Sequence, residues 1–325
     1  VLHYDQPILE VDGIVYKQQP LPPVGSTLIT WSATKPIDTN WFHQLLLWLP
    51  IGLVLSALAS FVVLRILRRL QSSHYRILDA IKAGEITVHY QPIVSLEDGR
   101  IVGAEALARW QQPDGRWLSP EVFIPVAEQT GVIGPLTEYI VHSVFNELGH
   151  WLAQHPEMHI SINIAAADLQ SATLPALIHQ QVQRWQVSTT QVAIEITERD
   201  LVARETAIPA LEAYRKQGYT IYIDDFGVGY SSLSYLNDLQ VDALKIDKTF
   251  VDTLECNPVV NHIIEIAKSL NLSVVAEGIE HESQREWLKA RGVTSGQGWL
   301  FSKPMPAEAF IDWAEDSLGH AGDER

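Results

Sequence analysis

The sequence predicts an α/β protein: a TIM-like (β/α)8 barrel with an antiparallel first strand, preceded by one transmembrane helix. Three observations lead to this prediction. Eight short apolar segments alternate with helix-period segments over about 240 residues. The first two apolar segments are joined only by "SLEDGR", residues 95–100, which is too short for a crossover helix and requires an antiparallel hairpin. An apolar run without any charge, residues 45–64, comes before all of them.

We expect the N-terminal part of the chain to lie on the extracytoplasmic side of the membrane. Residues 1–41 contain "YKQQPLPPVGSTLITWSA", which is typical of extended chain and strand, and we expect them to be the end of an extracytoplasmic sensor domain. The sequence starts at Val1 and not at Met, so we expect a fragment of a longer product. The transmembrane helix is expected over residues 42–66, because at about 1.5 Å per residue such a helix crosses a hydrocarbon core of ~30 Å.

The charges around the apolar run predict its orientation. Arg65, Arg68, Arg69 and Arg76 follow it, whereas the segment before it carries only lysines 17 and 35. The positive-inside rule therefore places the C-terminal part in the cytoplasm, with membrane lipid around the helix. We expect a cytoplasmic linker over residues 67–82, the barrel over 83–319 and a short tail over 320–325.

Composition excludes some kinds of function. The formal net charge is −16, which argues against direct binding of a nucleic-acid polymer, since that requires a basic face. The single cysteine, Cys256, excludes a disulfide within the sequence and a cysteine-based zinc site. If the ligand nevertheless carries phosphate, cations have to mediate the contact.

Eight segments are predicted as the strands of the barrel. They are "TVHYQPIV", "IVGAEALARW", "HISINIA", "QVAIEIT", "TIYIDDFG", "DALKID", "SVVAEGI" and "SGQGWLF". Seven of them carry polar side chains in the strand or just after it: Glu105, Asn163, Glu195, Asp224, Asp225, Lys245, Glu277 and Gln297. Any one of these alone would be interpreted as a surface residue or a helix cap. Because the carboxyl ends of barrel strands form the active-site face, their repetition predicts one shared site.

Asp224 and Asp225 indicate which ligand this site holds. Two adjacent carboxylates at the end of a buried strand repel each other and are costly to bury without a partner. Carboxylates with an asparagine carbonyl form an oxygen-rich site that suits Mg²⁺ or Mn²⁺ better than zinc. Two such ions about 3.5–4 Å apart would hold a phosphodiester and activate a water molecule for attack.

The segment 85–305 resembles the EAL-type cyclic-di-GMP phosphodiesterase domain along its whole length. The matching stretches are "HYQPIV", "EALAR" from Glu105 to Arg109, "INIAA", "EITE", "DDFGVGYSSL", "LKIDK", "VVAEGIE" and "GQGWLFSKP". This resemblance implies a (β/α)8 barrel with a reversed first strand. It also implies hydrolysis of one phosphodiester of cyclic-di-GMP, which gives linear pGpG.

The resemblance also implies a role for each matching residue. The metal ligands are Glu105, Asn163, Glu195, Asp224, Asp225 and Glu277, which hold two Mg²⁺ or Mn²⁺ ions. The substrate-binding residues are Gln91, Glu105, Leu107, Arg109 and Gln297. Lys245 is a catalytic group that contacts the water and phosphate, and Glu277 is the proposed general base. Glu198 braces the loop after the paired aspartates. Inhibition by Ca²⁺ and a homodimer formed through the barrel are also expected.

Three positions differ from the family pattern without removing a metal ligand: Ala165, Val228 and Trp299 stand where Ser, Thr and Tyr are usual. An extracytoplasmic piece followed by one span and this domain also resembles the CSS-motif sensor subfamily. An alternative to the enzyme remains open, namely a catalytically silent cyclic-di-GMP receptor that signals by conformational change. A scaffold with a vestigial barrel is a third hypothesis, but it gives no reason to keep Lys245 and Glu277.

Overall fold

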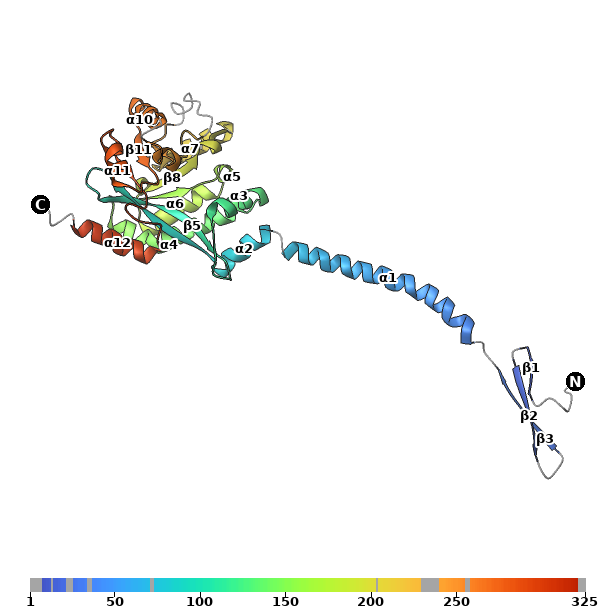
Figure 1. The fold of residues 1–325 in the computed structure, drawn as a ribbon. Coiled ribbons are helices and arrows are strands. Elements are labelled where there is room, and N and C mark those ends of the chain that lie inside the picture. The colour runs from blue at the N-terminus through green and yellow to red at the C-terminus, as the bar shows by residue number, and fades with distance from the viewer. Residues whose placement is uncertain are drawn as a thin grey trace. The chain divides into compact units, whose positions relative to one another are not determined.

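A computed structural model of the chain describes residues 8–12, 14–21, 26–33, 37–70, 73–202, 204–228, 240–254 and 258–320. Cys256, the tail beyond His320 and the predicted bracing loop beyond Val228 lie outside these residues. The chain forms two compact units, Val1–Leu70 and Gln71–Arg325, which are described separately (Figure 1).

The first unit holds a small sheet and a long helix. Strands β1 (Ile8–Val11), β2 (Ile14–Leu21) and β3 (Ser26–Ala33) form an antiparallel sheet in chain order. Helix α1 (Ile37–Leu70) contains the predicted transmembrane segment. Its stretch Leu46–Arg65 is long and apolar enough to cross a membrane and is not buried against the rest of the described chain.

The second unit contains a closed barrel of eight strands. In order around the barrel they are β4 (Ile86–Ser95), β5 (Ile101–Gln111), β7 (His159–Asn163), β8 (Val192–Thr197), β9 (Thr220–Asp224), β10 (Ala243–Ile246), β11 (Ser273–Ala276) and β12 (Ser295–Gly296). Strands β5 to β12 pair in parallel, whereas β4 pairs antiparallel with both β5 and β12 and closes the sheet. This confirms the predicted TIM-like barrel and its antiparallel first strand. A short strand, β6 (Trp117–Leu118), pairs with the end of β5.

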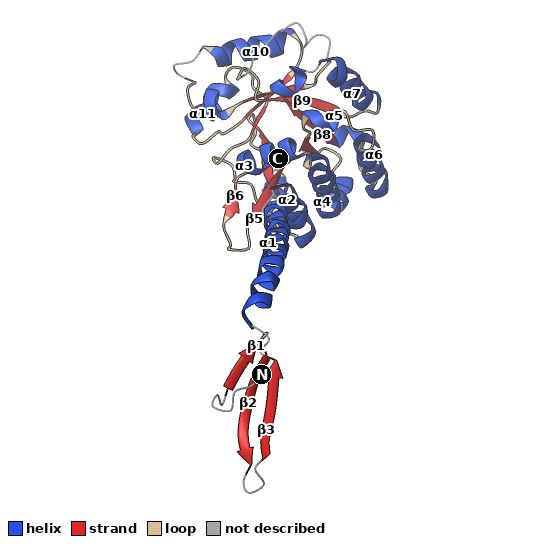
Figure 2. Ribbon diagram, turned by 90° about the vertical axis from the view of Figure 1, so that its right-hand side faces the viewer, coloured by secondary structure: helices blue, strands red, loops and turns tan. Residues whose placement is uncertain are grey.

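Helices cover the outside of the barrel (Figure 2). They are α2 (Ser73–Ala83), α3 (Pro120–Thr130), α4 (Ile133–Gln154), α5 (Ala166–Leu169), α6 (Leu174–Trp185), α7 (Arg204–Lys216), α9 (Lys248–Val251), α10 (Val259–Ser269), α11 (Glu282–Lys289) and α12 (Ala307–His320), with the 3-10 turns η1 (Thr189–Gln191) and η2 (Glu198–Val202). Helix α4 shows how they pack, since Leu136, Ile140, Val144 and Leu148 recur every four residues and are all buried. Helix α2 overlaps most of the predicted linker, residues 67–82, and buries Ile77 and Ala80 in the same core.

The strands of the barrel are apolar on both faces, as parallel strands covered by helices require. In β8, for example, Val192, Ala193, Ile194 and Ile196 are all buried. Against this background Glu195, in the same strand and with 0% of its surface exposed, is an exception that needs a partner.

Candidate active site

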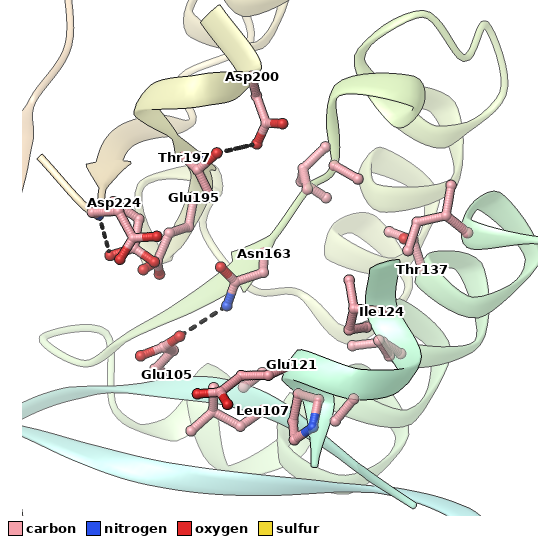
Figure 3. Close-up of a pocket in the computed structure, with 18 of the residues that line it drawn as sticks. Glu105, Leu107, Glu121, Ile124, Thr137, Asn163, Glu195, Thr197, Asp200 and Asp224 are labelled. Carbon is pink, nitrogen blue, oxygen red and sulfur yellow. Dashed lines mark hydrogen bonds between the residues drawn. The ribbon is translucent and has the colours of Figure 1, made fainter. Parts of the chain in front are cut away.

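A cavity of about 520 Å³ lies at the carboxyl ends of the parallel strands. Its lining brings together all six residues predicted as metal ligands, which come from β5, β7, β8, β9 and the segments that follow β9 and β11: Glu105, Asn163, Glu195, Asp224, Asp225 and Glu277. Figure 3 shows several of these side chains converging from separate strands. Lys245 and Gln297 do not line the cavity, but both are buried directly against the carboxylates.

Lys245 lies at the centre of the carboxylate cluster with none of its side chain exposed. Its Nζ lies 2.5 Å from Glu277 Oε1, 3.2 Å from Glu105 Oε2 and 3.6 Å from Asp224 Oδ1, and it also forms an ion pair with Glu195. Burial alone would lower the pKa of this ammonium group, but the charges of Glu105 and Glu277 raise it above its ordinary value. Lys245 is therefore a permanent buried cation.

One ammonium cannot neutralise five carboxylates. Burial, together with the charges of Glu277 and Glu105, raises the pKa of Asp224 well above its usual range. Burial raises the pKa of Glu277 to about 7, and it raises the pKa of Asp225 with help from the charge of Asp247. Raised carboxylate pKa values at close range mean that negative charge is in excess here. The site is therefore built to take up additional positive charge.

Amide side chains hold the carboxylates in place. Asn163 Nδ2 donates a hydrogen bond to Glu105 Oε1 at 2.8 Å, and Figure 3 shows these two side chains pointing toward each other. Gln297 Nε2 donates to Glu105 Oε2 at 2.6 Å and to Glu277 Oε1 at 3.2 Å. Burial raises the pKa of Glu105, but Lys245 and the two amides outweigh this and lower it overall. Glu105 is thus kept as a carboxylate.

The end of β9 explains how two adjacent aspartates reach one cavity. Successive side chains in a strand point to opposite faces, so Asp224 and Asp225 would be separated if the strand continued. The backbone instead turns at Asp225, whose φ of 53° lies in the left-handed region. The Asp225 N–H donates to Asp224 Oδ1 at 2.8 Å, and Phe226 behind it is buried. Both carboxylates consequently line the cavity.

Glu198 holds the turn that follows. It is 95% buried at the start of η2, and its Oε2 accepts a hydrogen bond from the Gly227 N–H at 2.9 Å. Gly227 has a φ of 96°, which a residue with a side chain rarely adopts. This contact is the one that a bracing glutamate would make.

The predicted substrate-binding residues differ in their placement. Glu105 and Leu107 line the cavity, and Gln297 lies behind it. Gln91 and Arg109 are not among its lining residues. Gln91 Nε2 instead donates to the Ser302 carbonyl at 3.3 Å, and Arg109 Nη1 donates to the carbonyl of Ala108 at 2.9 Å.

Sequence reasoning missed a second wall of the cavity. It is formed by residues of α3, α4 and the turns after β8 and β10: Pro120, Glu121, Ile124, Pro125, Glu128, Ile133, Thr137, Ile140, Asp200 and Asp247. These positions do not follow the pattern of polar residues at strand ends. The sequence signal for a helix here is the pair Ser119 and Pro120, a common helix start in which Pro120 is the first helical residue.

The donor set fits divalent cations. Carboxylate oxygens of Glu105, Glu195 and Glu277 lie within 4.8 Å of one another. Glu195 Oε2 and Gln297 Oε1 are buried and have no hydrogen-bond partner among the described residues. The described lining residues include no histidine or cysteine, and oxygen donors alone suit Mg²⁺ or Mn²⁺.

Fold and site together define a (β/α)8-barrel protein with an acidic cavity at the carboxyl ends of its strands, whose oxygen donors suit divalent cations. The chain belongs to the EAL domain family, whose sequence model matches residues 74–304.

Two proteins of Escherichia coli (strain K12) show the relationship. The chain is 54% identical over 310 residues to a probable cyclic di-GMP phosphodiesterase, PdeB, and the match covers 95% of this chain and 60% of that protein. It is 34% identical to the cyclic di-GMP phosphodiesterase PdeR, with 74% of this chain and 37% of that protein covered. The chain thus spans at most 60% of these two relatives.

Solved structures share the fold. The complex of the PaMucR phosphodiesterase with c-di-GMP superimposes with a TM-score of 0.69 at 34% identity, and covers 73% of this chain and 98% of that one. The EAL enzyme Bd1971, bound to cAMP and cyclic-di-GMP, gives a TM-score of 0.72 at 28% identity over 89% of this chain and 81% of that one.

Proposed function

We propose that this protein is a membrane-anchored phosphodiesterase that hydrolyses cyclic-di-GMP to linear pGpG. The observation that carries the proposal is the convergence of all six predicted ligands on one cavity, with Lys245 and Gln297 buried against them. The names of PdeB and PdeR, and the c-di-GMP complex of PaMucR, support the choice of substrate.

The cavity residues divide into groups with separate tasks. Glu105, Asn163, Glu195 and Asp224 would hold one Mg²⁺ or Mn²⁺ ion, and Asp225 with Glu277 would complete a second site. When bound, such ions lower the pKa of a coordinated water and neutralise charge on the phosphate. The many carboxylates would repel a substrate phosphate, so cation binding is also the condition for substrate binding.

The protein's own side chains orient the reaction. Glu277 is the proposed proton acceptor for the attacking water, and Gln297 fixes its carboxylate relative to that of Glu105. Lys245 supplies a fixed positive charge next to both glutamates, which favours the developing charge of the transition state. Leu107, Arg109 and Gln91 are the proposed contacts to the rest of the nucleotide.

Location and regulation form a further part of the proposal. Helix α1 would anchor the protein in the bacterial inner membrane with the barrel in the cytoplasm, supported by its apolar stretch and the arginines that follow it. Dimerisation through the barrel would pass a signal from an extracytoplasmic sensor, as in the CSS-motif subfamily, to the loop braced by Glu198.

A turnover assay tests the proposal. The full chain in detergent micelles is incubated with cyclic-di-GMP and Mg²⁺, and pGpG is measured by chromatography. We expect Mg²⁺-dependent formation of pGpG that is lost in Glu277→Gln. Binding of cyclic-di-GMP without turnover would instead make the protein a catalytically silent receptor.

A further inference from the structure

Asp168 is a buried carboxylate to which neither the sequence pattern nor the proposed mechanism gives a task. It lies in α5, three residues after Ala165, and 3% of its surface is exposed. Its Oδ2 accepts a hydrogen bond from Thr137 Oγ1 of α4 at 2.6 Å. The backbone N–H of Asp168 donates a hydrogen bond to the Ala165 carbonyl at 2.9 Å.

The second of these contacts fixes the chain just beyond Asn163. Ala165 is the residue before the first turn of α5, its backbone is extended, and it has no side chain that could cap the helix. Asp168 ties the first turn of α5 to Ala165 through its main chain and to α4 through its side chain. Ile164, between Asn163 and Ala165, donates its N–H to the Glu195 carbonyl at 2.8 Å.

The arrangement is similar to the one at Glu198. There, a buried carboxylate from another element accepts the N–H of Gly227, two residues after Asp225. Here, the buried carboxylate of Asp168 is bonded to α4, and the N–H of the same residue holds the carbonyl of Ala165, two residues after Asn163. In both cases the main chain is held immediately beyond a predicted ligand.

We propose that Asp168, held by Thr137, is a positioning residue that sets the Asn163 side chain for cation binding. Asn163 has one amide nitrogen committed to Glu105, so its carbonyl can serve a cation only if the backbone keeps this orientation. Release of Ala165 would let Asn163 rotate away from Glu105. This inference rests on the cation site of the proposed function.

Four variants of the full chain in detergent micelles test the inference. Asp168→Asn removes the charge and one of two acceptor oxygens, and Thr137→Val removes the hydroxyl donor. Thr137→Ser keeps that donor, and Glu138→Gln alters an exposed carboxylate next to Thr137 on α4 as a matched control. Mn²⁺ binding is measured by calorimetry, and half-saturating Mg²⁺ is measured from hydrolysis of cyclic-di-GMP.

We expect Asp168→Asn to weaken Mn²⁺ binding and to raise half-saturating Mg²⁺ by about tenfold, the usual effect of losing a group that orients a metal ligand. Thr137→Val should also weaken Mn²⁺ binding and raise half-saturating Mg²⁺. Thr137→Ser and Glu138→Gln should keep the Mn²⁺ affinity and half-saturating Mg²⁺ of the wild type. If Asp168→Asn only lowers the unfolding temperature and still binds Mn²⁺ like the wild type, Asp168 is merely structural.

The calorimetric measurement separates this inference from the proposed activity. A wild-type protein that binds Mn²⁺ but releases no pGpG refutes the proposed phosphodiesterase. The variants then still test the positioning role of Asp168 through Mn²⁺ affinity. If Asp168→Asn does not fold, Thr137→Val decides the question alone, and wild-type Mn²⁺ affinity in that variant overturns the inference.

Discussion

Replacement of Lys245 by methionine should make folding depend on divalent cations. Among the described residues, Lys245 is the one cation that forms ion pairs with the carboxylates of Glu105, Glu195, Asp224 and Glu277. Methionine has a similar volume and fills the space, so the loss is mainly one of charge. The remaining carboxylates must then be buried without compensation or take up protons.

The size of the effect follows from this geometry. Removal of one partner from a buried ion pair destabilises a protein by about 3–5 kcal/mol. For a domain of this size each kcal/mol lowers the unfolding temperature by about 2–4 °C, which gives a decrease on the order of 10 °C in EDTA. Mg²⁺ should restore part of the lost unfolding temperature, because a bound cation neutralises the same carboxylates. Turnover should nevertheless stay low, since loss of a fixed positive charge near the reacting phosphate lowers kcat by about 100-fold.

Differential scanning fluorimetry with EDTA and with Mg²⁺, together with steady-state kinetics, measures these effects. Lys248→Met is the matched control, because Lys248 lies in the same segment but is about half exposed and pairs with Glu280. An unfolding temperature of Lys245→Met equal to wild type in EDTA would refute the charge-balance reasoning. A large rise in KM with unchanged kcat would make Lys245 a substrate anchor.

Four further results are expected. Asp224→Asn should abolish turnover in a folded protein, because it removes a ligand charge, and wild-type rates with Mg²⁺ would exclude Asp224 as a ligand. Ca²⁺ should support cyclic-di-GMP binding but inhibit hydrolysis, because its longer bonds of about 2.3–2.6 Å do not suit a tight pair of sites, and equal rates with Ca²⁺ and Mg²⁺ would contradict this. Glu198→Ala should raise half-saturating Mg²⁺ and lower the maximal rate, and a Mg²⁺ titration identical to wild type would remove its bracing role. Acid should destabilise the barrel through His159, because burial lowers the pKa of its imidazole to about 4. The unfolded chain then binds the extra proton, so the contribution of His159 to stability falls by roughly 3 kcal/mol as pH decreases from about 6.5 to 4. The raised pKa of Glu277 acts in the opposite direction over the same range, so chemical denaturation should show the contribution as the difference in pH dependence between wild type and His159→Gln.

Much of the barrel could be predicted because its determinants are local. Each strand is a short apolar run bounded by turn residues, and the length of "SLEDGR" alone requires the antiparallel pair that closes the barrel. The ligand set could be predicted for a related reason. A polar residue near the end of an apolar strand is a local feature, and the fold guarantees that such ends meet.

The rest of the site depends on geometry that no local pattern encodes. The left-handed φ of Asp225 is a property of one residue, and aspartate occurs in many other conformations. Thr137 lines the cavity because of the way α4 packs on the barrel, which the sequence pattern does not encode. Asp168 looks in the sequence like an ordinary polar residue of a short helix. The central position of Lys245 among four carboxylates likewise needs the closed barrel, since its partners come from four other strands or strand ends.

The two buried carboxylates of Asp168 and Glu198 suggest how activity can be controlled without disturbing the barrel. The strands are buried on both faces and deform little, so a signal cannot readily move Glu105 or Glu195. Asn163 and Asp225 differ, because Asn163 ends β7, Asp225 directly follows β9, and the main chain two residues beyond each is bonded to a residue with a buried carboxylate. A shift of α4 would act through Asp168, and a shift of η2 would act through Glu198. Cation occupancy can therefore change while the remaining ligands stay in place. If Asp168 and Glu198 act on separate ligands, the double variant of Asp168→Asn with Glu198→Ala should show additive losses in Mn²⁺ affinity.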